Sequence, residues 1–218
     1  MYKKKLNIAL IGCGRIAGHH FKAIKKIRDL NIVSVCDKNL KKAEFYGKKF
    51  NVPFFKNYNE MFIKMESINI VVVMTPSGMH YEHTMDIIKK YKKNIIVEKP
   101  TFMKPEHVSN AYSLAKKNKV RIFPVFQNRY NKAVQRVKKA ITKNELGKIR
   151  IVSVRVRWCR PDRYYKLSKW RGTYSQDGGA LTNQGIHHVD LIRYFCGDVK
   201  NVNATMRTLG AQIEVEDS

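Results

Sequence analysis

Acidic residues are scarce in this 218-residue sequence, since 17 Asp and Glu stand against 43 Lys and Arg and give a formal net charge of +26. Long apolar runs are missing as well, because no stretch approaches the roughly 18 residues that cross a bilayer. At 44% hydrophobic residues, however, the chain is too apolar for a disordered polycation. We therefore expect no membrane partner and a folded chain with enough core for one large or two small domains.

Cysteine is also sparse, and its placement excludes two kinds of stabilised fold. Cys13, Cys36, Cys159 and Cys196 lie far apart without a C-x-x-C pair, which predicts neither a disulfide framework nor a structural zinc site. Reduced thiols of this kind are typical of a cytoplasmic protein. The lysines before Leu6–Ile11 and Cys13 resemble a lipoprotein signal, but this apolar run is shorter than the ~7–15 residues such a signal needs.

Signatures of nucleic-acid recognition are missing despite the positive charge. The lysines form short runs spread along the whole chain, and most of them fall at the polar faces or ends of helical patterns. No basic helix with base-reading residues, zinc finger or RNA-recognition sheet accompanies them. We interpret the charge as a solvated surface that attracts anionic ligands in general, and we predict no nucleic-acid partner.

The first half of the chain alternates apolar strand patterns with amphipathic helical patterns, which predicts an α/β fold with a doubly wound parallel sheet over residues 1–122. Strands are expected at 6–11, 32–36, 70–74, 94–97 and 120–125, and helices at 16–27, 40–50, 81–90 and 105–117.

The pattern changes beyond this half, and residues 123–218 predict an α+β open-sheet domain for substrate binding or dimerisation. We expect helices at 132–142 and 177–195, strands at 149–158 and 201–209, a strand beginning at 212–215, and a polar, aromatic loop at 159–176. The chain stops directly after a strand pattern, so we expect this domain to be C-terminally truncated.

A glycine-rich turn joins the first predicted strand to the first helix. Gly12 permits the tight turn, Gly14 lets the backbone approach a pyrophosphate, and Ala17 allows close packing. Asp37 ends the second strand about 25 residues later, where an acidic residue binds ribose hydroxyls and repels the extra phosphate of NADP. The pattern predicts NAD as the cofactor, although Lys38 weakens the charge argument and a glycine turn in another α/β protein remains the alternative.

Two further polar segments leave their roles open. Thr75-Pro76-Ser77-Gly78 follows a predicted strand at the edge where ligands bind, but the same residues also make ordinary turns. His80 and His83 have the spacing of a metal pair. Because no third ligand is spaced nearby, we favour two histidines on a helix and predict no metal site.

Together with Glu98-Lys99-Pro100, these motifs resemble the glucose–fructose oxidoreductase / inositol dehydrogenase / MocA family in order and position. The resemblance implies an NAD-dependent dehydrogenase acting on a CH–OH group. It also implies an NAD site formed by Gly12, Gly14, Arg15, Ile16, Asp37, Thr75, Pro76, His80, Glu98, Lys99 and Gln127.

Within that family, the second half is similar to the UDP-N-acetyl-glucosaminuronate 3-dehydrogenases. The motifs that carry this similarity are Gln127–Asn131, Arg157–Arg160, Trp170–Thr173 and Asp177–Asp190. The resemblance implies oxidation of the C3 hydroxyl of a nucleotide sugar, UDP-N-acetyl-2-amino-2-deoxy-glucuronate, during synthesis of bacterial surface polysaccharide, including lipopolysaccharide.

Lys99 and His187 are the catalytic residues that the resemblance implies. Hydride transfer from an alcohol needs a group that removes the hydroxyl proton, and a lysine does so only when burial and nearby positive charge favour its neutral form. Asn183 stands where many relatives have Asp and cannot take up a proton, so we expect it to orient the substrate. Whether His187 or His188 is the catalytic histidine stays open.

The substrate site is expected to contain Lys99, Arg157, Arg160, Tyr165, Trp170, Arg171, Asn183 and His187. Guanidinium groups suit the diphosphate and carboxylate of a sugar nucleotide, and aromatic faces suit its rings. For each single arginine, a place on the surface over a small hydrophobic loop is an equally good interpretation.

Two rival functions stay open: another sugar or inositol dehydrogenase of the same family, and a non-catalytic NAD-binding module. The resemblance implies longer chains that form homo-oligomers, dimers or tetramers, through the outer face of their sheet. We therefore expect this chain to be a fragment or a shortened homologue that self-associates through an incomplete sheet.

Overall fold

The computed structural model describes residues 5–218, which divide into two compact units. The first unit ends at Val125 and the second spans Phe126–Ser218. This division lies a few residues beyond the boundary expected before Phe123, because strand β6 (Ile122–Pro124) still pairs with strand β5 (Asn94–Val97) of the first unit. Each unit is described by itself.

The first unit contains the predicted parallel sheet, with six strands in the order β3-β2-β1-β4-β5-β6. The remaining strands are β1 (Leu6–Ile11), β2 (Leu30–Cys36), β3 (Phe54–Phe55) and β4 (Ile70–Val73). The strand order reverses between β1 and β4, and in such sheets ligands bind outside the carboxyl ends of the strands at this reversal. The topology therefore shows where to look for a ligand site.

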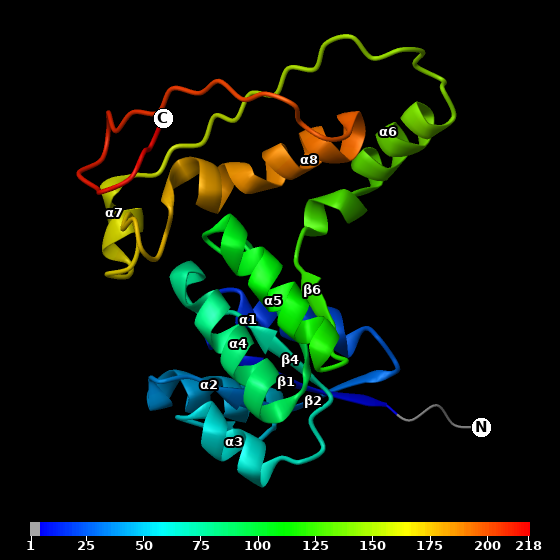
Figure 1. The fold of residues 1–218 in the computed structure, drawn as a ribbon. Coiled ribbons are helices and arrows are strands. Elements are labelled where there is room, and N and C mark those ends of the chain that lie inside the picture. The colour runs from blue at the N-terminus through cyan, green and yellow to red at the C-terminus, as the bar shows by residue number, and fades with distance from the viewer. Residues whose placement is uncertain (1–4) are drawn as a thin grey trace. The chain divides into compact units, whose positions relative to one another are not determined.

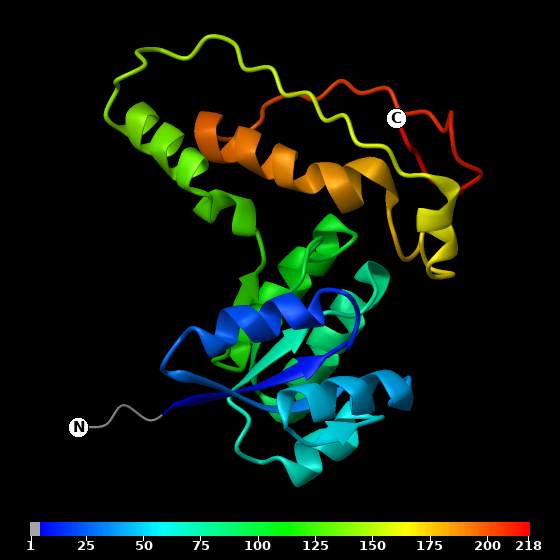
Figure 2. The same ribbon diagram turned by 180° about the vertical axis from the view of Figure 1, so that it is seen from behind.

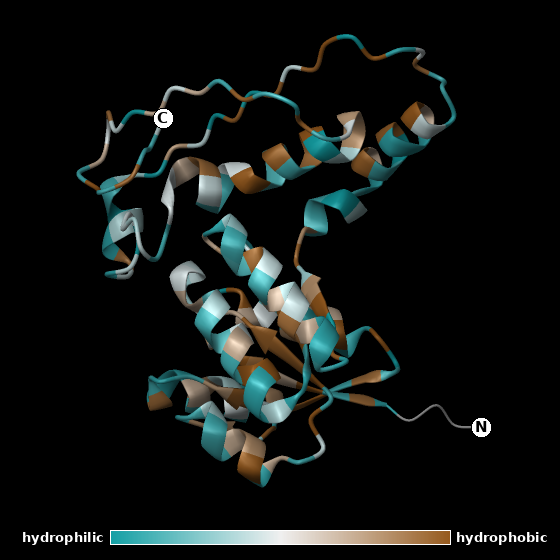
Figure 3. Ribbon diagram, viewed as in Figure 1, coloured by the Kyte–Doolittle hydropathy of each residue, from teal (hydrophilic) through white to brown (hydrophobic). Residues whose placement is uncertain are grey.

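Helices cover both faces of this sheet: α1 (Ala17–Lys25), α2 (Leu40–Phe50), α3 (Tyr58–Lys64), α4 (His80–Tyr91), which follows the short 3₁₀ turn η1 (Ser77–Met79), and α5 (Pro105–Lys117). Ile8 and Leu10 pack with α1 and α2, whereas their neighbours on β1 pack with α3, α4 and α5. Figure 1 shows the face that α4 and α5 cover, and Figure 2 shows α1 on the opposite face. The strands between these layers are predominantly hydrophobic (Figure 3).

The second unit consists mainly of helices and extended chain. Its elements are η2 (Gln127–Tyr130), α6 (Lys132–Thr142), α7 (Asp162–Lys166), the π-helical turn η3 (Leu181–Gly185) and α8 (Ile186–Cys196). Arg129 joins η2 to α8 through two hydrogen bonds to Asp190, of 2.8 Å from Nε and 2.6 Å from an Nη atom. The Arg129 guanidinium also lies 4.9 Å from the ring centre of Tyr194.

Four expectations for the second unit are wrong in detail. The segments 149–158, 201–209 and 212–215 are not strands, and α7 interrupts the expected loop 159–176. Val152, Val154 and Val156 keep the alternating strand pattern but stay partly exposed. A strand needs a hydrogen-bonded neighbour, and within residues 5–218 no ladder forms along 149–158.

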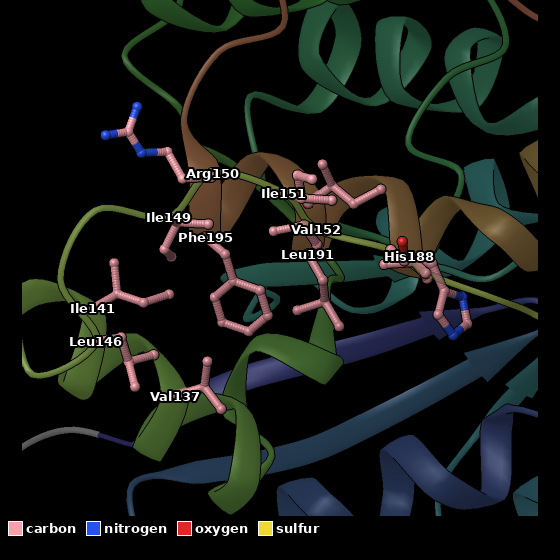
Figure 4. A pocket seen from close by; sticks show the side chains of 13 residues that line it. Val137, Ile141, Leu146, Ile149, Arg150, Ile151, Val152, His188, Leu191 and Phe195 are labelled. Atoms are coloured by element: carbon pink, nitrogen blue, oxygen red, sulfur yellow. The ribbon is translucent and has the colours of Figure 1, made fainter.

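An apolar pocket of about 530 Å³ lies between α6, α8 and the extended chain at 149–154. In Figure 4, side chains such as Val137, Leu191 and Phe195 surround it. Its lining is mostly aliphatic and aromatic, with Arg150, Ser153 and His188 as the polar members. None of the predicted substrate-binding residues lines this pocket. Within the described residues, no helix is both long and apolar enough to cross a membrane.

Candidate active site

Three strands bring the predicted cofactor residues of the first unit to one edge of the sheet. Gly12 follows β1 and donates its backbone N–H to the carbonyl of Cys36, at 2.8 Å. Cys13 donates its N–H to Oδ2 of Asp37 at the end of β2, also at 2.8 Å. Met74 continues β4 and donates to the carbonyl of Ile11. The glycine turn, Asp37 and the loop after β4 are thus neighbours.

The glycine turn has the shape that a pyrophosphate needs. Gly12 has a φ of +100°, and a Cβ atom there would lie 2.6 Å from the backbone oxygen of Met74. A Cβ on Gly14 would meet no atom within 4 Å, so this position faces open space. Within the described residues, no side chain caps the N-terminus of α1, and the positive end of the helix dipole there attracts an anion. Arg15 and Ile16 are exposed beside it.

Asp37 is positioned by the backbone around it. Its Oδ1 accepts the N–H of Asn39 at 2.8 Å, in addition to the Cys13 contact. A carboxylate has about four acceptor positions, so two further hydrogen bonds, such as those from ribose hydroxyls, can be accepted. Tyr46 of α2 donates its hydroxyl to the carbonyl of Gly14 at 3.1 Å and holds the same turn from outside. These residues fit an NAD cofactor.

Cys13 and Cys36 lie beside this turn as structural thiols. Burial, assisted by the negative charge of Asp37, raises the pKa of both thiols to about 12. Because only the thiolate is a good nucleophile, these two residues are unreactive at neutral pH.

The loop after β4 is held by two histidines of α4. Thr75 Oγ1 lies 3.0 Å from Nδ1 of His83, and the Thr75 carbonyl lies 2.8 Å from Nε2 of His80. The other ring nitrogen of His80 lies 2.8 Å from the carbonyl of Pro100. His80 is only 1% exposed and contacts carbonyls through both nitrogens, which does not suit a metal ligand. Its predicted contact with the cofactor stays a prediction.

The segment 98–100 follows β5, where the N–H of Glu98 donates to the carbonyl of Val73 at 3.0 Å. Oε1 of Glu98 lies 2.7 Å from Nε2 of His20 in α1, and Oε2 accepts the backbone N–H of Lys99 at 3.1 Å. Burial disfavours the Glu98 carboxylate, but its contacts with His20 and Lys99 outweigh this and lower the pKa of Glu98. Lys99 is half-buried, and Pro100 follows a cis peptide bond.

In the second unit, a buried carboxylate positions the residues before α8. Asp177 is 4% exposed and accepts the N–H of Gly172 at 2.7 Å, and it also accepts a hydrogen bond from the Asn183 amide. Asn183, 6% exposed, accepts a hydrogen bond of 2.9 Å from Gln184. Asn183 lies in the π-helical turn η3, a feature that occurs often at functional sites.

His187 and Gln127 come together at the start of α8. Nε2 of His187 lies 3.5 Å from Nε2 of Gln127, so a predicted catalytic residue meets a predicted cofactor residue. His188 instead lines the apolar pocket. The two histidines therefore differ in surroundings: His187 lies beside Gln127, another predicted site residue, and His188 lines the pocket.

Arg160 and Arg171 flank the ring of Tyr164 in α7. Their guanidinium carbons lie 4.4 and 4.3 Å from its ring centre, and each also lies near a tryptophan, at 3.9 Å from Trp158 and 4.7 Å from Trp170. Arg160 donates to Gln184 at 2.8 Å and Arg171 donates to the Tyr164 hydroxyl. Within the described residues, the buried Nε atoms of both arginines have no hydrogen-bond partner. This cationic cluster suits an anionic ligand.

Other predicted substrate residues are less clearly placed. Trp170 lies beside Arg171, and Tyr165 packs edge to face with Tyr164 at 5.2 Å. Arg157 is exposed on the extended chain, outside the contacts of this cluster.

The sequence placed Tyr164 in the aromatic loop with the arginines, but it did not predict the contact of His20 with Glu98 or that of Asp177 with Asn183. The rule that ligands bind at the carboxyl ends of adjacent strands points to the position of Glu98. Nothing in the sequence spacing indicated that Glu98 contacts His20, 78 positions earlier.

Residues 6–126 match the model described as "Oxidoreductase family, NAD-binding Rossmann fold", and residues 134–218 match the GFO/IDH/MocA C-terminal domain. The WlbA dehydrogenase from Chromobacterium violaceum, solved with NADH and UDP-GlcNAcA, superimposes with a TM-score of 0.94 at 34% identity, covering 100% of this chain and 63% of that one. The Bordetella pertussis WlbA dehydrogenase, solved with the same ligands, gives 0.94 and 33%, covering 98% and 65%.

Curated relatives agree with this assignment. The glucose-6-phosphate 3-dehydrogenase of Bacillus subtilis is 32% identical over 92% of this chain and 57% of its own length. The D-glucoside 3-dehydrogenase of Escherichia coli is 30% identical over 97% and 61%, respectively. This chain thus spans about 60% of the length of these relatives. The two matching models cover nearly all of the sequence, and the chain belongs to the GFO/IDH/MocA oxidoreductase family, with an NAD-binding Rossmann fold in its first half.

Proposed function

We propose that this protein oxidises the C3 hydroxyl of a nucleotide sugar, UDP-N-acetylglucosaminuronate, with NAD as the acceptor. The observation that carries the substrate is the cluster of Arg160 and Arg171 around Tyr164, because a sugar uronate linked to a diphosphate needs several cations. The two WlbA dehydrogenases, solved with UDP-GlcNAcA, support this choice. The names of the two curated relatives, both 3-dehydrogenases, support the carbon that reacts.

The reaction breaks the C3–H and O–H bonds of the alcohol and forms a ketone. NAD, when bound, supplies the nicotinamide carbon that takes up the hydride. The chain must hold the sugar and remove the hydroxyl proton. We assign proton removal to Lys99 with His187 as its partner, and orientation of the sugar to Asn183. The hydrogen bonds of Asp177 and Gln184 fix the side chain of Asn183 for this role.

A second candidate is a sugar phosphate as substrate. The arginine cluster also suits a phosphate monoester, and the Bacillus subtilis relative is named for glucose 6-phosphate. Incubation with NAD and each of three sugars separates these candidates: UDP-GlcNAcA, UDP-GlcNAc and glucose 6-phosphate. We expect a 3-keto product, assayed by mass spectrometry, mainly from UDP-GlcNAcA. Faster conversion of glucose 6-phosphate would overturn the nucleotide-sugar proposal.

Arg171→Leu is expected to raise KM for UDP-GlcNAcA about tenfold or more, because a hydrogen bond to a charged group contributes about 1.5–3 kcal/mol. Arg171→Lys keeps the positive charge but loses the planar guanidinium group, so its KM should lie between those of the parent and Arg171→Leu. Lys169→Gln removes an exposed cation from the same loop and serves as the control. Equal KM values for the parent and Arg171→Leu would remove Arg171 from the substrate site.

Asp37→Ser is expected to relax the preference for NAD over NADP, because it removes the carboxylate that repels the 2′-phosphate. The serine variant also loses acceptors for the N–H groups of Cys13 and Asn39. Asp37→Asn keeps one acceptor at nearly the same size and separates lost charge from lost structure. Cofactor dissociation constants measured for the parent and both variants test this. If the parent protein binds NADP as tightly as NAD, Asp37 does not select NAD and the assignment of its role is wrong.

A further inference from the structure

Two histidines contact the turn that carries Lys99: one contacts the residue before Lys99, and the other contacts the residue after it. On one side, His20 of α1 contacts the Glu98 carboxylate at 2.7 Å, and Glu98 in turn accepts the N–H of Lys99. On the other side, His80 of α4 contacts the carbonyl of Pro100 at 2.8 Å. Both histidines belong to the first unit, as does the whole turn.

We propose that His20 and His80 are positioning residues that hold Lys99 in place by fixing the residues on either side of it. This inference rests on the proposed role of Lys99. It adds two residues, from helices on opposite faces of the sheet, whose contacts are with the neighbours of Lys99: His20 with Glu98, and His80 with Pro100.

The burial of these contacts makes them rigid. The side chains of His20 and Glu98 are 15% and 12% exposed, and His80 is 1% exposed. Hydrogen bonds shielded from water are stronger than those at the surface, and breaking them leaves an unsatisfied buried group. Rotation of the Lys99 backbone would therefore break a buried hydrogen bond on at least one side.

His80 also connects the turn to the loop after β4. Its second ring nitrogen contacts the Thr75 carbonyl at 2.8 Å, so one imidazole bridges the two loops at the carboxyl ends of β4 and β5. Burial lowers the pKa of His80, against the raising effects of the two carbonyls and Glu98, while Lys99 lowers it further. The neutral ring carries one N–H, so at any time it donates to one of the two carbonyls, either that of Pro100 or that of Thr75.

Three variants test the proposal, with two readouts. His20→Leu removes the contact with Glu98, His20→Gln replaces it with an amide donor, and His80→Phe keeps a buried ring without either nitrogen. The first readout is hydrogen exchange of the Lys99 amide in the cofactor-free protein. The second is kcat with NAD and UDP-GlcNAcA, together with the dissociation constant for NAD. His107→Phe is the control, because His107 of α5 stacks at 3.8 Å on Tyr81 of α4, and neither residue belongs to the two loops.

We expect His20→Leu to speed exchange of the Lys99 amide at least tenfold, with partial recovery in His20→Gln. Both His20→Leu and His80→Phe should lower kcat about 10- to 100-fold, the cost of misplacing a reacting group by about 1 Å. His20→Leu should leave NAD affinity within threefold of the parent. His107→Phe should change neither readout.

Unchanged exchange and unchanged kcat in His20→Leu and His80→Phe would overturn the proposal. Faster exchange across the whole of β4 and β5 would also overturn it, because that result indicates general loosening of the sheet. Altered Lys99 exchange in variants of a parent that converts none of the sugars would uphold the positioning of the turn and refute the proposed function instead.

Discussion

Lys99→Ala is expected to lower kcat about 10²- to 10⁴-fold, the range typical of a lost general acid or base, while the dissociation constant for NAD stays nearly unchanged. The variant removes the group that takes the hydroxyl proton but leaves the glycine turn and Asp37 in place. Steady-state kinetics with NAD and UDP-GlcNAcA, combined with a cofactor titration, measure both quantities. Turnover within about threefold of the parent, far below that range, would show that Lys99 is not the base.

Lys99→Arg sharpens this experiment, because arginine keeps the positive charge but does not lose its proton. It should be nearly as slow as Lys99→Ala if proton transfer is the role of Lys99. Lys89→Ala on the exposed part of α4 controls for the loss of any lysine. His187→Ala is expected to cost less than Lys99→Ala, and the reverse ranking would exchange the two roles.

Gly12→Ala is expected to destabilise the first unit by about 2–5 kcal/mol, since it combines a left-handed backbone with overpacking. The new Cβ would lie 2.6 Å from the oxygen and 2.7 Å from the carbon of the Met74 carbonyl. Both are backbone atoms of the chain that continues β4, so the clash cannot be relieved by a side-chain rotation. Hydrogen exchange in β1 and β4 measures the loss.

Two other glycines of the same region provide matched controls. Gly14→Ala meets no atom within 4 Å, so it should leave stability unchanged and weaken NAD binding by blocking the backbone's approach to the pyrophosphate. Gly18→Ala in α1 also meets no atom within 4 Å, so it should not lower stability, since alanine favours a helix more than glycine does, and it should leave NAD binding unchanged. Trp158 and Trp170, both in the second unit, should keep their fluorescence in all three variants. Normal stability of Gly12→Ala would contradict the turn geometry.

The first unit could be predicted well because local and global signals agree there. The fully apolar run that contains β4 indicated a strand buried on both faces, and Val71, Val72 and Val73 are indeed inaccessible to solvent. The short strand β3 and helix α3 were missed. Asn57, which caps α3 by accepting the N–H of Asn59 at 2.7 Å, and Glu60 have the spacing of a capping box, and this signal could have found the helix.

The second unit was less predictable, because the partners that a strand needs can be distant from it in the sequence. Residues 149–158 alternate as a strand does, yet the described chain gives them no ladder. Helices α6 and α8, which lie before and after this segment, form their hydrogen bonds internally and need no such partner. Asn131 caps α6 by accepting the N–H of Ala133 at 3.0 Å, and the apolar spacing of α6 predicted this helix correctly.

The candidate site divides in the same way. Gly12 and Asp37 could be named from the sequence because each follows a strand of a recognisable sheet, and Lys99 could be named through the family resemblance. The contacts of His20 with Glu98 and of Asp177 with Asn183 could not be predicted, because hydrogen bonds between distant residues leave no periodic signal. The structure supplies these contacts.

Transfer of deuterium from C3 of the sugar to the cofactor tests the central claim most directly. The protein is incubated with NAD and UDP-GlcNAcA that carries deuterium at C3, and both products are analysed by mass spectrometry after denaturation, which also recovers cofactor that stays bound. We predict one deuterium in the NADH and a 3-keto sugar that has lost it. Unlabelled NADH formed together with a keto sugar that retains its deuterium, or no product at all, would contradict the account.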